Sequence, residues 1–352
     1  MAARRLGTTT LLLISLAANV VLFFTRAPRH EAAPQILGAA DEAVRLAALV
    51  EEEPALRLPF PLDQGEWASS LLAHTDAASF RRVTYGKASF WFPADDVWHA
   101  VDFIQKNEAP NVQYWADAIA ARQQTGRPCY IADVGSNGGY YSMLSRALGC
   151  AVLAVDAQPR CLERLASGAA VNGWATGWTT RWTAVSNKAN VQFEVGADRC
   201  SGLWAVRDSK WINDESASQV TVRGTDLLTL VEGWEPRLAD PAPASAADDA
   251  VITALKIDTE GSEIAVLASA LPLLRAGRIL HILVEVVPDR ISKISSAAEV
   301  RSTVEGLYGA GYACKPINKK RFFTQSEALA AILEKPQKPL PVDWTCSLWQ
   351  PE

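Results

Sequence analysis

Histidine is scarce in this sequence of 352 residues, and no two cysteines have the Cys-x-x-Cys spacing. The four histidines, His30, His74, His99 and His281, are widely separated along the chain. Zinc sites are built mainly from closely spaced cysteine and histidine ligands. The sequence therefore predicts no metal site.

Basic residues are also fewer than acidic ones, 34 against 39. The formal net charge is -5 at pH 7, and the first thirty residues carry four arginines and no acidic side chain. The rest of the chain therefore has 30 basic and 39 acidic residues. Nucleic-acid-binding domains need a basic surface to neutralise phosphates, so nucleic acid is not an expected partner. The hydrophobic content of 49% is typical of globular proteins and excludes a mostly disordered chain.

The N-terminus contains a long uncharged stretch, from Leu6 to Thr25, with arginines on both sides. About 20 apolar residues are enough for a helix to cross the hydrocarbon core of a bilayer. We expect residues 1–26 to form an uncleaved signal anchor, which makes this a single-pass membrane protein with its body in the lumen of the endoplasmic reticulum or Golgi. The alternatives are a cleaved signal peptide and a transit peptide, which would give a secreted or organellar protein.

The cysteines are compatible with two environments. Disulfides would suit an oxidising lumen, and buried free thiols are an equally good interpretation at this chain length. The six residues are Cys129, Cys150, Cys161, Cys200, Cys314 and Cys346.

The chain after the anchor divides by composition. Residues 27–66 resemble a stem, with an alanine-rich stretch followed by prolines. Residues 67–127 are rich in tryptophan and phenylalanine and are expected to form a cap that packs on the next domain, residues 128–352. Within that domain, residues 238–250 form a low-complexity insertion, which is typical of a surface loop.

Short apolar runs alternate with helical stretches in the last domain. Apolar strands separated by helices predict an α/β fold, with a doubly wound, mostly parallel sheet covered on both faces. Gly311–Ile317 and Trp344–Trp349 are expected to pair as antiparallel strands at one edge. The five expected parallel strands are Tyr130–Val134, Ala151–Val155, Thr179–Val185, Val251–Ile257 and Ile279–Val286.

A glycine-rich turn follows the first of these strands in the segment IADVGSNGGYYSML. Gly135 permits the turn, and Gly138 and Gly139 allow a ligand to approach the backbone. Asp156 ends the second strand, where its carboxylate is well placed to accept hydrogen bonds from ribose hydroxyls. Asp133 would repel a pyrophosphate and suits a ligand with an amino group, which disfavours a nicotinamide-dependent oxidoreductase.

A second group of acidic residues follows the fourth and fifth strands. Asp258 and Glu260 lie in LKIDTEGSEIAVL, and Glu285 ends the strand ILVEV, so all three are expected at the same edge of the sheet. Lys256 points to the same face as Asp258 and is expected to pair with a carboxylate. Glu263 is interpreted as a charge that caps the following helix.

These motifs together resemble the FkbM family of S-adenosylmethionine (SAM)-dependent methyltransferases. The resemblance is carried by Asp133–Ser142, Asp156 and Lys256–Glu263, and Val220–Leu230 and Ile282–Val286 are also similar to segments of the family. It implies a seven-stranded class I methyltransferase core and SAM as the cofactor. It further implies that Asp156 holds the ribose and that Ala184–Asn187, chiefly Val185 and Ser186, border the adenine. The residues expected at the amino-acid end of SAM are Asp133, Gly135, Ser136, Asn137, Gly138, Gly139 and Tyr140.

The expected reaction is transfer of a methyl group to a hydroxyl of a glycan or another small acceptor. Alignment of the reactants and a base that removes the hydroxyl proton would assist the transfer. Glu260 and Asp258 are the candidate bases, with Glu285 as the third. A non-catalytic binding or scaffold protein on the same fold is the main alternative, and a nicotinamide-dependent oxidoreductase is a weaker one.

Overall fold

The computed structural model describes part of the chain: residues 80–93, 101–174, 176–188, 191–196, 200, 219–234, 251–334 and 342–348. The chain divides into two units, Met1–Glu53 and Pro54–Glu352, and the described residues all belong to the second. The predicted anchor, the stem and the 238–250 insertion lie outside the described residues. Within the described ranges, no helix is long and apolar enough to cross a membrane.

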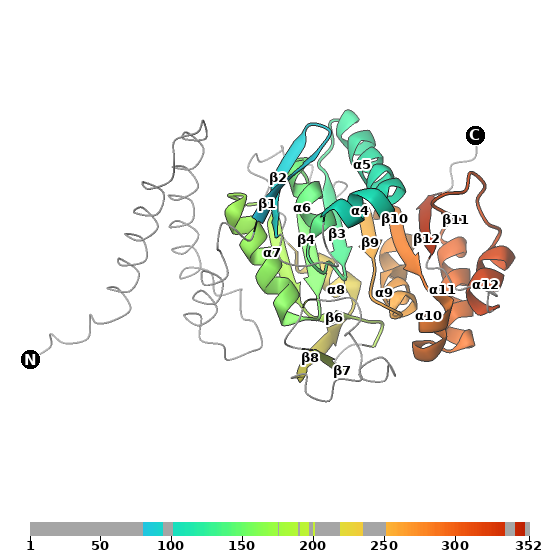
Figure 1. Ribbon diagram of the computed structural model, residues 1–352. Coiled ribbons are helices and arrows are strands. Elements are labelled where there is room, and N and C mark those ends of the chain that lie inside the picture. The colour runs from blue at the N-terminus through green and yellow to red at the C-terminus, as the bar shows by residue number, and fades with distance from the viewer. Residues whose placement is uncertain are drawn as a thin grey trace, which may run out of the picture. The chain divides into compact units, whose positions relative to one another are not determined.

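A seven-stranded sheet forms the centre of the second unit, as Figure 1 shows. Its strand order is β11-β12-β10-β9-β3-β4-β5. The five strands from β10 to β5 are parallel, and β12 runs antiparallel to both of its neighbours. The mostly parallel sheet and the antiparallel edge pair are therefore confirmed. The strands are β3 (Tyr130–Val134), β4 (Ala151–Asp156), β5 (Trp178–Trp182), β9 (Ile252–Ile257), β10 (Ile279–Val286), β11 (Tyr312–Pro316) and β12 (Val342–Leu348).

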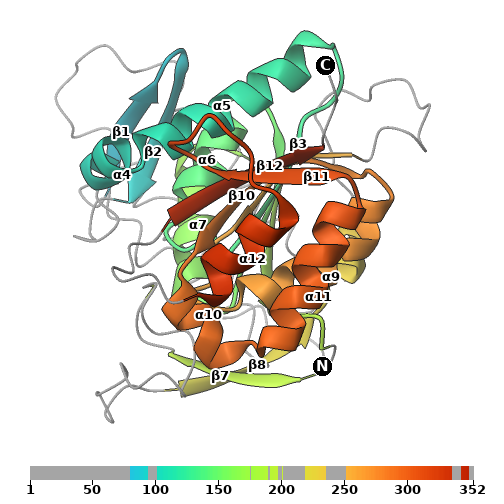
Figure 2. The same ribbon diagram turned by 90° about the vertical axis from the view of Figure 1, so that its right-hand side faces the viewer.

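Helices cover both faces of this sheet, which confirms the doubly wound arrangement (Figures 1 and 2). On one face, Ile131 of β3 and Val152 of β4 pack against α5 (Ala109–Gln124), α6 (Tyr140–Ala147) and α7 (Pro159–Val171). On the other face, Ala132 and Leu153 share a core with α8 (Leu227–Glu232), α9 (Glu263–Arg275), α11 (Ala297–Gly309) and α12 (Gln325–Leu333). The short helix α10 (Pro288–Ile294) follows β10. Alternate side chains of each buried strand thus belong to different cores.

The aromatic-rich segment before the sheet forms a hairpin and two helices. Strands β1 (Phe80–Tyr85) and β2 (Ala88–Pro93) pair antiparallel, and α4 (Val101–Asn107) leads into α5. Phe90 and Phe92 are buried against Tyr140, while Trp91 between them is 43% exposed. The alternation places the apolar face of the hairpin on α6 and α7.

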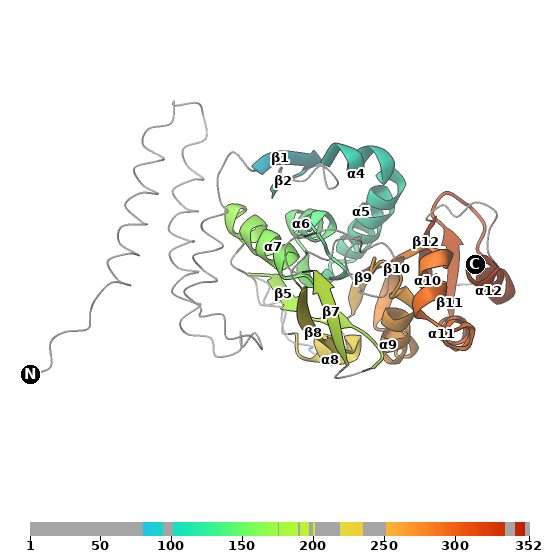
Figure 3. The ribbon, with the colours of Figure 1, turned by 60° about the horizontal axis from the view of Figure 1, so that its bottom comes forward.

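The expected strand Thr179–Val185 breaks at Thr183. The Thr183 hydroxyl donates to the Arg223 carbonyl oxygen (2.6 Å), which draws the chain away from the main sheet. The next residues form β6 (Ala184–Val185), which pairs with β8 (Gln219–Thr225). Strand β7 (Gln192–Gly196) completes a separate small sheet of order β6-β8-β7, seen beside α8 in Figure 3. Val185 therefore belongs to this small sheet.

All six cysteines are described, and all are paired. The disulfides are Cys129–Cys150, Cys161–Cys200 and Cys314–Cys346. The alternative of buried free thiols is therefore wrong. Disulfides persist in oxidising compartments and are rare in the cytosol.

Candidate active site

The glycine turn after β3 is held between the neighbouring strands β4 and β9. The backbone N–H groups of Gly135 and Ser136 both donate to the Val155 carbonyl oxygen, at 2.9 and 3.1 Å. Gly135 has φ +75°, and a Cβ atom there would lie 1.8 Å from the carbonyl oxygen of Asp258. Only glycine fits this position, because the clash would be with backbone that cannot move aside. The turn therefore brings the ends of β3, β4 and β9 close together.

Asp156 at the end of β4 is tied to the same turn. Its Oδ2 accepts from the Asn137 N–H and its Oδ1 from the Gln158 N–H, both at 2.8 Å. The side chain is only 5% exposed. Burial raises the pKa of Asp156 to about 6, and the two backbone hydrogen bonds limit that rise. Each carboxylate oxygen has a second lone pair, so Asp156 can still accept from ribose hydroxyls.

A cavity of about 440 Å³ opens beside this turn. Its size is within the range of small-molecule sites. Of the predicted residues, those that line it are Gly135, Asn137, Asp156, Val185, Ser186, Asp258 and Glu260. Sequence reasoning missed its apolar wall, which includes Val191, Phe193 and Val195 from around β7 and Ile264 and Leu271 from α9. That wall suits the adenine ring, which the resemblance had placed against Ala184–Asn187.

Other predicted residues lie away from the cavity lining. Asp133 is fully buried, accepts from the Ser142 hydroxyl (2.6 Å) through Oδ2, and has no hydrogen-bond partner for Oδ1 among the described residues. The Ser136 hydroxyl donates to the Val155 carbonyl oxygen (3.3 Å). Tyr140 packs into the hairpin contact described above. The further predicted residues outside the described lining are Gly138, Gly139 and Glu285.

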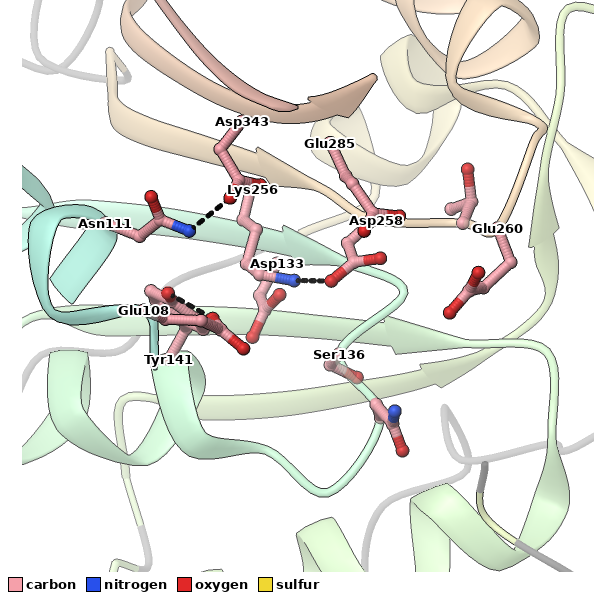
Figure 4. A network of polar contacts seen from close by, with 12 residues as sticks. Glu108, Asn111, Asp133, Ser136, Tyr141, Lys256, Asp258, Glu260, Glu285 and Asp343 are labelled. Carbon is pink, nitrogen blue, oxygen red and sulfur yellow. Dashed lines mark hydrogen bonds and ion pairs between the residues drawn. The ribbon is translucent and has the colours of Figure 1, made fainter. Parts of the chain in front are cut away.

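Lys256 is the central cation of the next group, shown in Figure 4. Its Nζ donates to Asp258 Oδ2 (2.8 Å), as expected, and lies 5.1 Å from the centre of the Tyr141 ring. Burial alone would lower the pKa of Lys256, but the charges of Asp258 and Asp133 raise it. The ammonium group therefore stays charged although the residue is only 7% exposed.

A row of carboxylates crosses three neighbouring strands beside Lys256. Glu285 of β10 is the register partner of Asp343 of β12, and Asp258 follows β9 next to Glu285. Burial and the charges of Asp258, Glu263 and Asp343 raise the pKa of Glu285 to about 9. Glu285 therefore holds a proton at neutral pH.

The junction of α4 and α5 adds polar groups to this row (Figure 4). Asn111 Nδ2 donates to Asp343 Oδ2 (2.7 Å), and the Tyr141 hydroxyl donates to Glu108 Oε2 (2.7 Å). Burial raises the pKa of both Glu108 and Asp343. Sequence reasoning missed Glu108, Asn111 and Asp343. One of them could have been found from the last strand. The sequence predicted that strand to begin at Trp344, but it begins at Val342, and with this start Asp343 lies at the same edge of the sheet as Glu285.

Glu260 follows β9 with a left-handed backbone, φ 57°. Glutamate adopts this conformation rarely, and such strain is concentrated at functional sites. Its carboxylate forms an ion pair with Arg290, which also lies 3.5 Å from Glu285 Oε2. Arg290 was not predicted. Oxygens of Asp258, Glu260 and Glu285 approach within 4.8 Å of one another, a spacing that could hold a metal ion, and Arg290 supplies a positive charge to two of the three.

Glu263 has the structural role that the sequence predicted. It is 1% exposed, and its Oε1 accepts from the backbone N–H groups of Thr259 and Gly261, both at 2.9 Å. These bonds fix the loop that carries Asp258 and Glu260 at the start of α9.

The strand order, the glycine turn, the acid that ends β4 and the cavity at the carboxyl edge are the arrangement expected of a class I methyltransferase that uses SAM. The sequence profile of the Methyltransferase FkbM domain matches residues 133–312, about half of the chain. The chain belongs to the FkbM methyltransferase family. A search of curated proteins finds no match.

A search of solved structures finds similarity to methyltransferases at low identity. A SAM-dependent methyltransferase from Agrobacterium tumefaciens is 12% identical, with a TM-score of 0.39 and coverage of 77% of this chain and 70% of that one. The bifunctional kinase-methyltransferase WbdD is 9% identical, with a TM-score of 0.35, and the match covers 72% and 42% of the two chains. The plantazolicin methyltransferase BpumL, solved with SAH, is 11% identical, with a TM-score of 0.31 and coverage of 70% and 88%.

Proposed function

We propose that this protein is an O-methyltransferase that transfers the methyl group of SAM to a hydroxyl of a glycan or another hydroxylated acceptor. The observation that carries the proposal is the position of Asp258. It lines the donor cavity and also begins the carboxylate row of Glu285 and Asp343. A methyl group held in the donor cavity and a hydroxyl held beside the carboxylate row would therefore meet next to the Asp258 carboxylate.

The donor cavity fits SAM on three grounds. Asp156 can accept from the ribose hydroxyls, Val191, Phe193 and Val195 form an apolar wall for the faces of the adenine ring, and the volume is within the range of small-molecule sites. When bound, SAM supplies a methyl group that is already activated by a sulfonium cation. The protein's own task is to hold the acceptor in line and to receive its proton.

Asp258 and Glu260 are the candidate proton acceptors. Both line the cavity, and each is oriented by a fixed cation, Lys256 for Asp258 and Arg290 for Glu260. Glu285 lies behind them and holds its own proton at neutral pH because its pKa is raised. Glu285 is therefore suited to donate a hydrogen bond to the acceptor and poorly suited to act as its base.

We call the group around Lys256, with its carboxylates and Arg290, the acceptor side of the site, and the cavity with the glycine turn and Asp156 the donor side. The negative charge of the acceptor side favours a neutral substrate. Glu108, Asp258, Glu285 and Asp343 surround the ammonium group of Lys256, Asn111 adds an amide, and Arg290 lies beside Glu285 and Glu260. Carboxylates and amides accept hydrogen bonds from hydroxyls, whereas ionised carboxylates repel phosphate, sulfate or carboxylate groups. The acceptor is therefore a polyhydroxylated group without an anionic substituent beside the reacting hydroxyl.

The three disulfides support a location in an oxidising compartment. Together with the expected anchor at residues 1–26, they favour a single-pass membrane protein with its catalytic domain in the lumen of the endoplasmic reticulum or Golgi. Its partners would then be SAM, a glycan or small-molecule acceptor, and the membrane.

The test is methyl transfer from isotopically labelled SAM to matched acceptors. Neutral glycans are paired with glycans that differ only by a uronic acid or a sulfate, and products are located by mass spectrometry. We expect label on hydroxyls of the neutral member of a pair. Label on nitrogen, or preference for the anionic member, contradicts the proposal. Failure of the purified protein to bind SAM in calorimetry rejects it altogether.

A further inference from the structure

The three disulfides lie at different places in the fold. Cys129–Cys150 joins the amino ends of β3 and β4, and Cys314–Cys346 joins register partners on β11 and β12. Cys161–Cys200 joins the first turn of α7 to a residue just beyond β7. This third bond lies beside the donor cavity.

The Cys161–Cys200 disulfide is in contact with the glycine turn. Sγ of Cys200 lies 3.0 Å and Sγ of Cys161 lies 3.8 Å from Oδ1 of Asn137. A disulfide sulfur carries no proton, so this is a packing contact. Asn137 has φ 49° and donates its N–H to Asp156. The disulfide therefore packs directly on the residue that orients the ribose-binding carboxylate.

The bond also closes a loop that carries one wall of the cavity. Residues 183–188, Val191, Phe193 and Val195 line the cavity, and all lie between Cys161 and Cys200. Their strands β6 and β7 pair with β8 and not with the seven-stranded sheet. The start of this wall is tied to the main sheet through the Thr183 N–H, which donates to the Asp156 carbonyl oxygen (3.2 Å). The disulfide adds a second link, because it joins Cys161, which contacts Asn137, to Cys200, which follows the wall in the sequence.

We propose that the Cys161–Cys200 disulfide is a positioning element for the methyl donor. It holds Asn137, and through it Asp156, at a fixed separation from the β6–β7 wall, so that ribose and adenine contacts form together. The proposal rests on SAM occupying this cavity, as the proposed function requires. It concerns donor binding, so the transfer step itself should be unaffected by loss of the bond.

The test compares two double variants made in an oxidising host, Cys161→Ser/Cys200→Ser and Cys314→Ser/Cys346→Ser. Their disulfides span 39 and 32 residues, so loss of either should lower the melting temperature by a similar amount. The second loop contains no described residue of the cavity lining. It therefore controls for general destabilisation.

For Cys161→Ser/Cys200→Ser we expect the Kd and KM of SAM to rise about tenfold with kcat nearly unchanged, since displacement of the wall from the glycine turn weakens the ribose and adenine contacts by an amount on the order of one hydrogen bond. For the control we expect the Kd of SAM to stay at the wild-type value. Equal Kd values in the two variants, or a loss confined to kcat, overturn the proposal.

If Cys161→Ser/Cys200→Ser does not fold, folded wild-type protein is treated with dithiothreitol. The reagent reduces a disulfide to two thiols and is itself oxidised to a cyclic disulfide. The Kd of SAM should rise with the fraction of Cys161 that is reduced, which is measured by alkylating separate quenched samples with iodoacetamide. It should return when the unalkylated protein is reoxidised. A Kd that does not follow Cys161 overturns the proposal.

Asp156→Ala separates this proposal from the proposed function. If Asp156→Ala leaves SAM affinity unchanged, SAM does not occupy the cavity and both proposals fail. If Asp156→Ala weakens binding and the loss of Cys161–Cys200 does not, only the positioning role of the disulfide fails.

Discussion

The two sides of the site hold their carboxylates in different ways. On the donor side, Asp156 is held by backbone N–H groups of Asn137 and Gln158. On the acceptor side, side chains hold the carboxylates: Lys256 for Asp258, Arg290 for Glu260, and Asn111 for Asp343, which is 232 residues away in sequence. Backbone donors cannot be lost by substitution of a side chain. The donor side is therefore robust to sequence change, and the acceptor side can be retuned residue by residue.

This difference matches the two tasks of a methyltransferase. Every such enzyme in the fold receives the same donor, so a binding site made from backbone geometry serves all of them. The acceptor varies, and side chains from α5, β10 and β12 can change without disturbing the glycine turn.

The largest expected effect is the loss of kcat when the catalytic base is replaced. Asp258→Asn or Glu260→Gln should lower kcat by roughly 10²–10⁴-fold, whichever residue is the base, and leave the Kd of SAM unchanged. Glu285→Gln is the matched control, because a glutamine resembles the protonated carboxyl that the raised pKa maintains. Its kcat should fall far less. Single-turnover transfer and calorimetry measure the two quantities, and a larger loss in Glu285→Gln would assign the base to Glu285.

Lys256 on the acceptor side should contribute more to the free energy of unfolding than Lys188 on the donor side. Lys256→Met leaves Asp258 and Asp133 without their buried partner and should lower the free energy of unfolding by about 3–5 kcal/mol. Lys188 at the donor cavity pairs with Glu299 at 3.4 Å, with side chains 64% and 40% exposed. Lys188→Met should cost at most about 1 kcal/mol. Urea denaturation measures both, and equal losses would mean that Lys256 is not the structural centre of the acceptor side.

The sequence was sufficient to predict most of the donor side. A strand that ends in Asp133-Val134 before glycines, and a second strand ending in Asp156, obey local rules of strand and turn formation. The sheet has both strands at these places, and Asp156 lines the cavity whereas Asp133 does not. The apolar wall of the cavity could not be predicted, because the chain leaves the main sheet at Thr183 through a bond to Arg223, forty residues further along the chain.

The acceptor side was predicted only where it follows a strand of the parallel sheet. Asp258, Glu260 and Glu285 meet that condition. Glu108 and Asn111 come from the junction of two helices, and Arg290 from a short helix after β10. No local pattern marks these residues as polar partners of a distant strand. Their roles depend on tertiary packing that a single sequence does not encode by spacing.

Gly135 of the donor side packs against the backbone of Asp258 on the acceptor side. A Cβ there would meet the Asp258 carbonyl oxygen, so Gly135→Ala should cost roughly 3 kcal/mol or more, from the left-handed backbone and the clash together. Gly277 has a similar φ of +65°, but a Cβ at that position would have no described heavy atom within 4 Å. Gly277→Ala should cost only about 1–2 kcal/mol, from backbone strain alone. Equal melting temperatures for the two variants would mean that β3 and β9 can separate at this point.

The pH dependence of SAM binding should come from the donor side. Burial raises the pKa of Asp156 to about 6, whereas an unfolded aspartate titrates near about 4. Ribose hydroxyls need the ionised form as acceptor, so SAM affinity should fall about tenfold per pH unit below about 6, as Asp156 takes up a proton. The stability of the free protein should change in the opposite direction: between about 4 and 6 the folded state binds more protons than the unfolded state, so this contribution to stability decreases as pH rises. Asp156→Asn should bind SAM more weakly at neutral pH and lose the dependence in this window. Calorimetry from pH 5 to 8 measures the Kd of SAM in both proteins. If the affinity of Asp156→Asn still falls below pH 6, the titrating group is Asp133 or a carboxylate of the acceptor side.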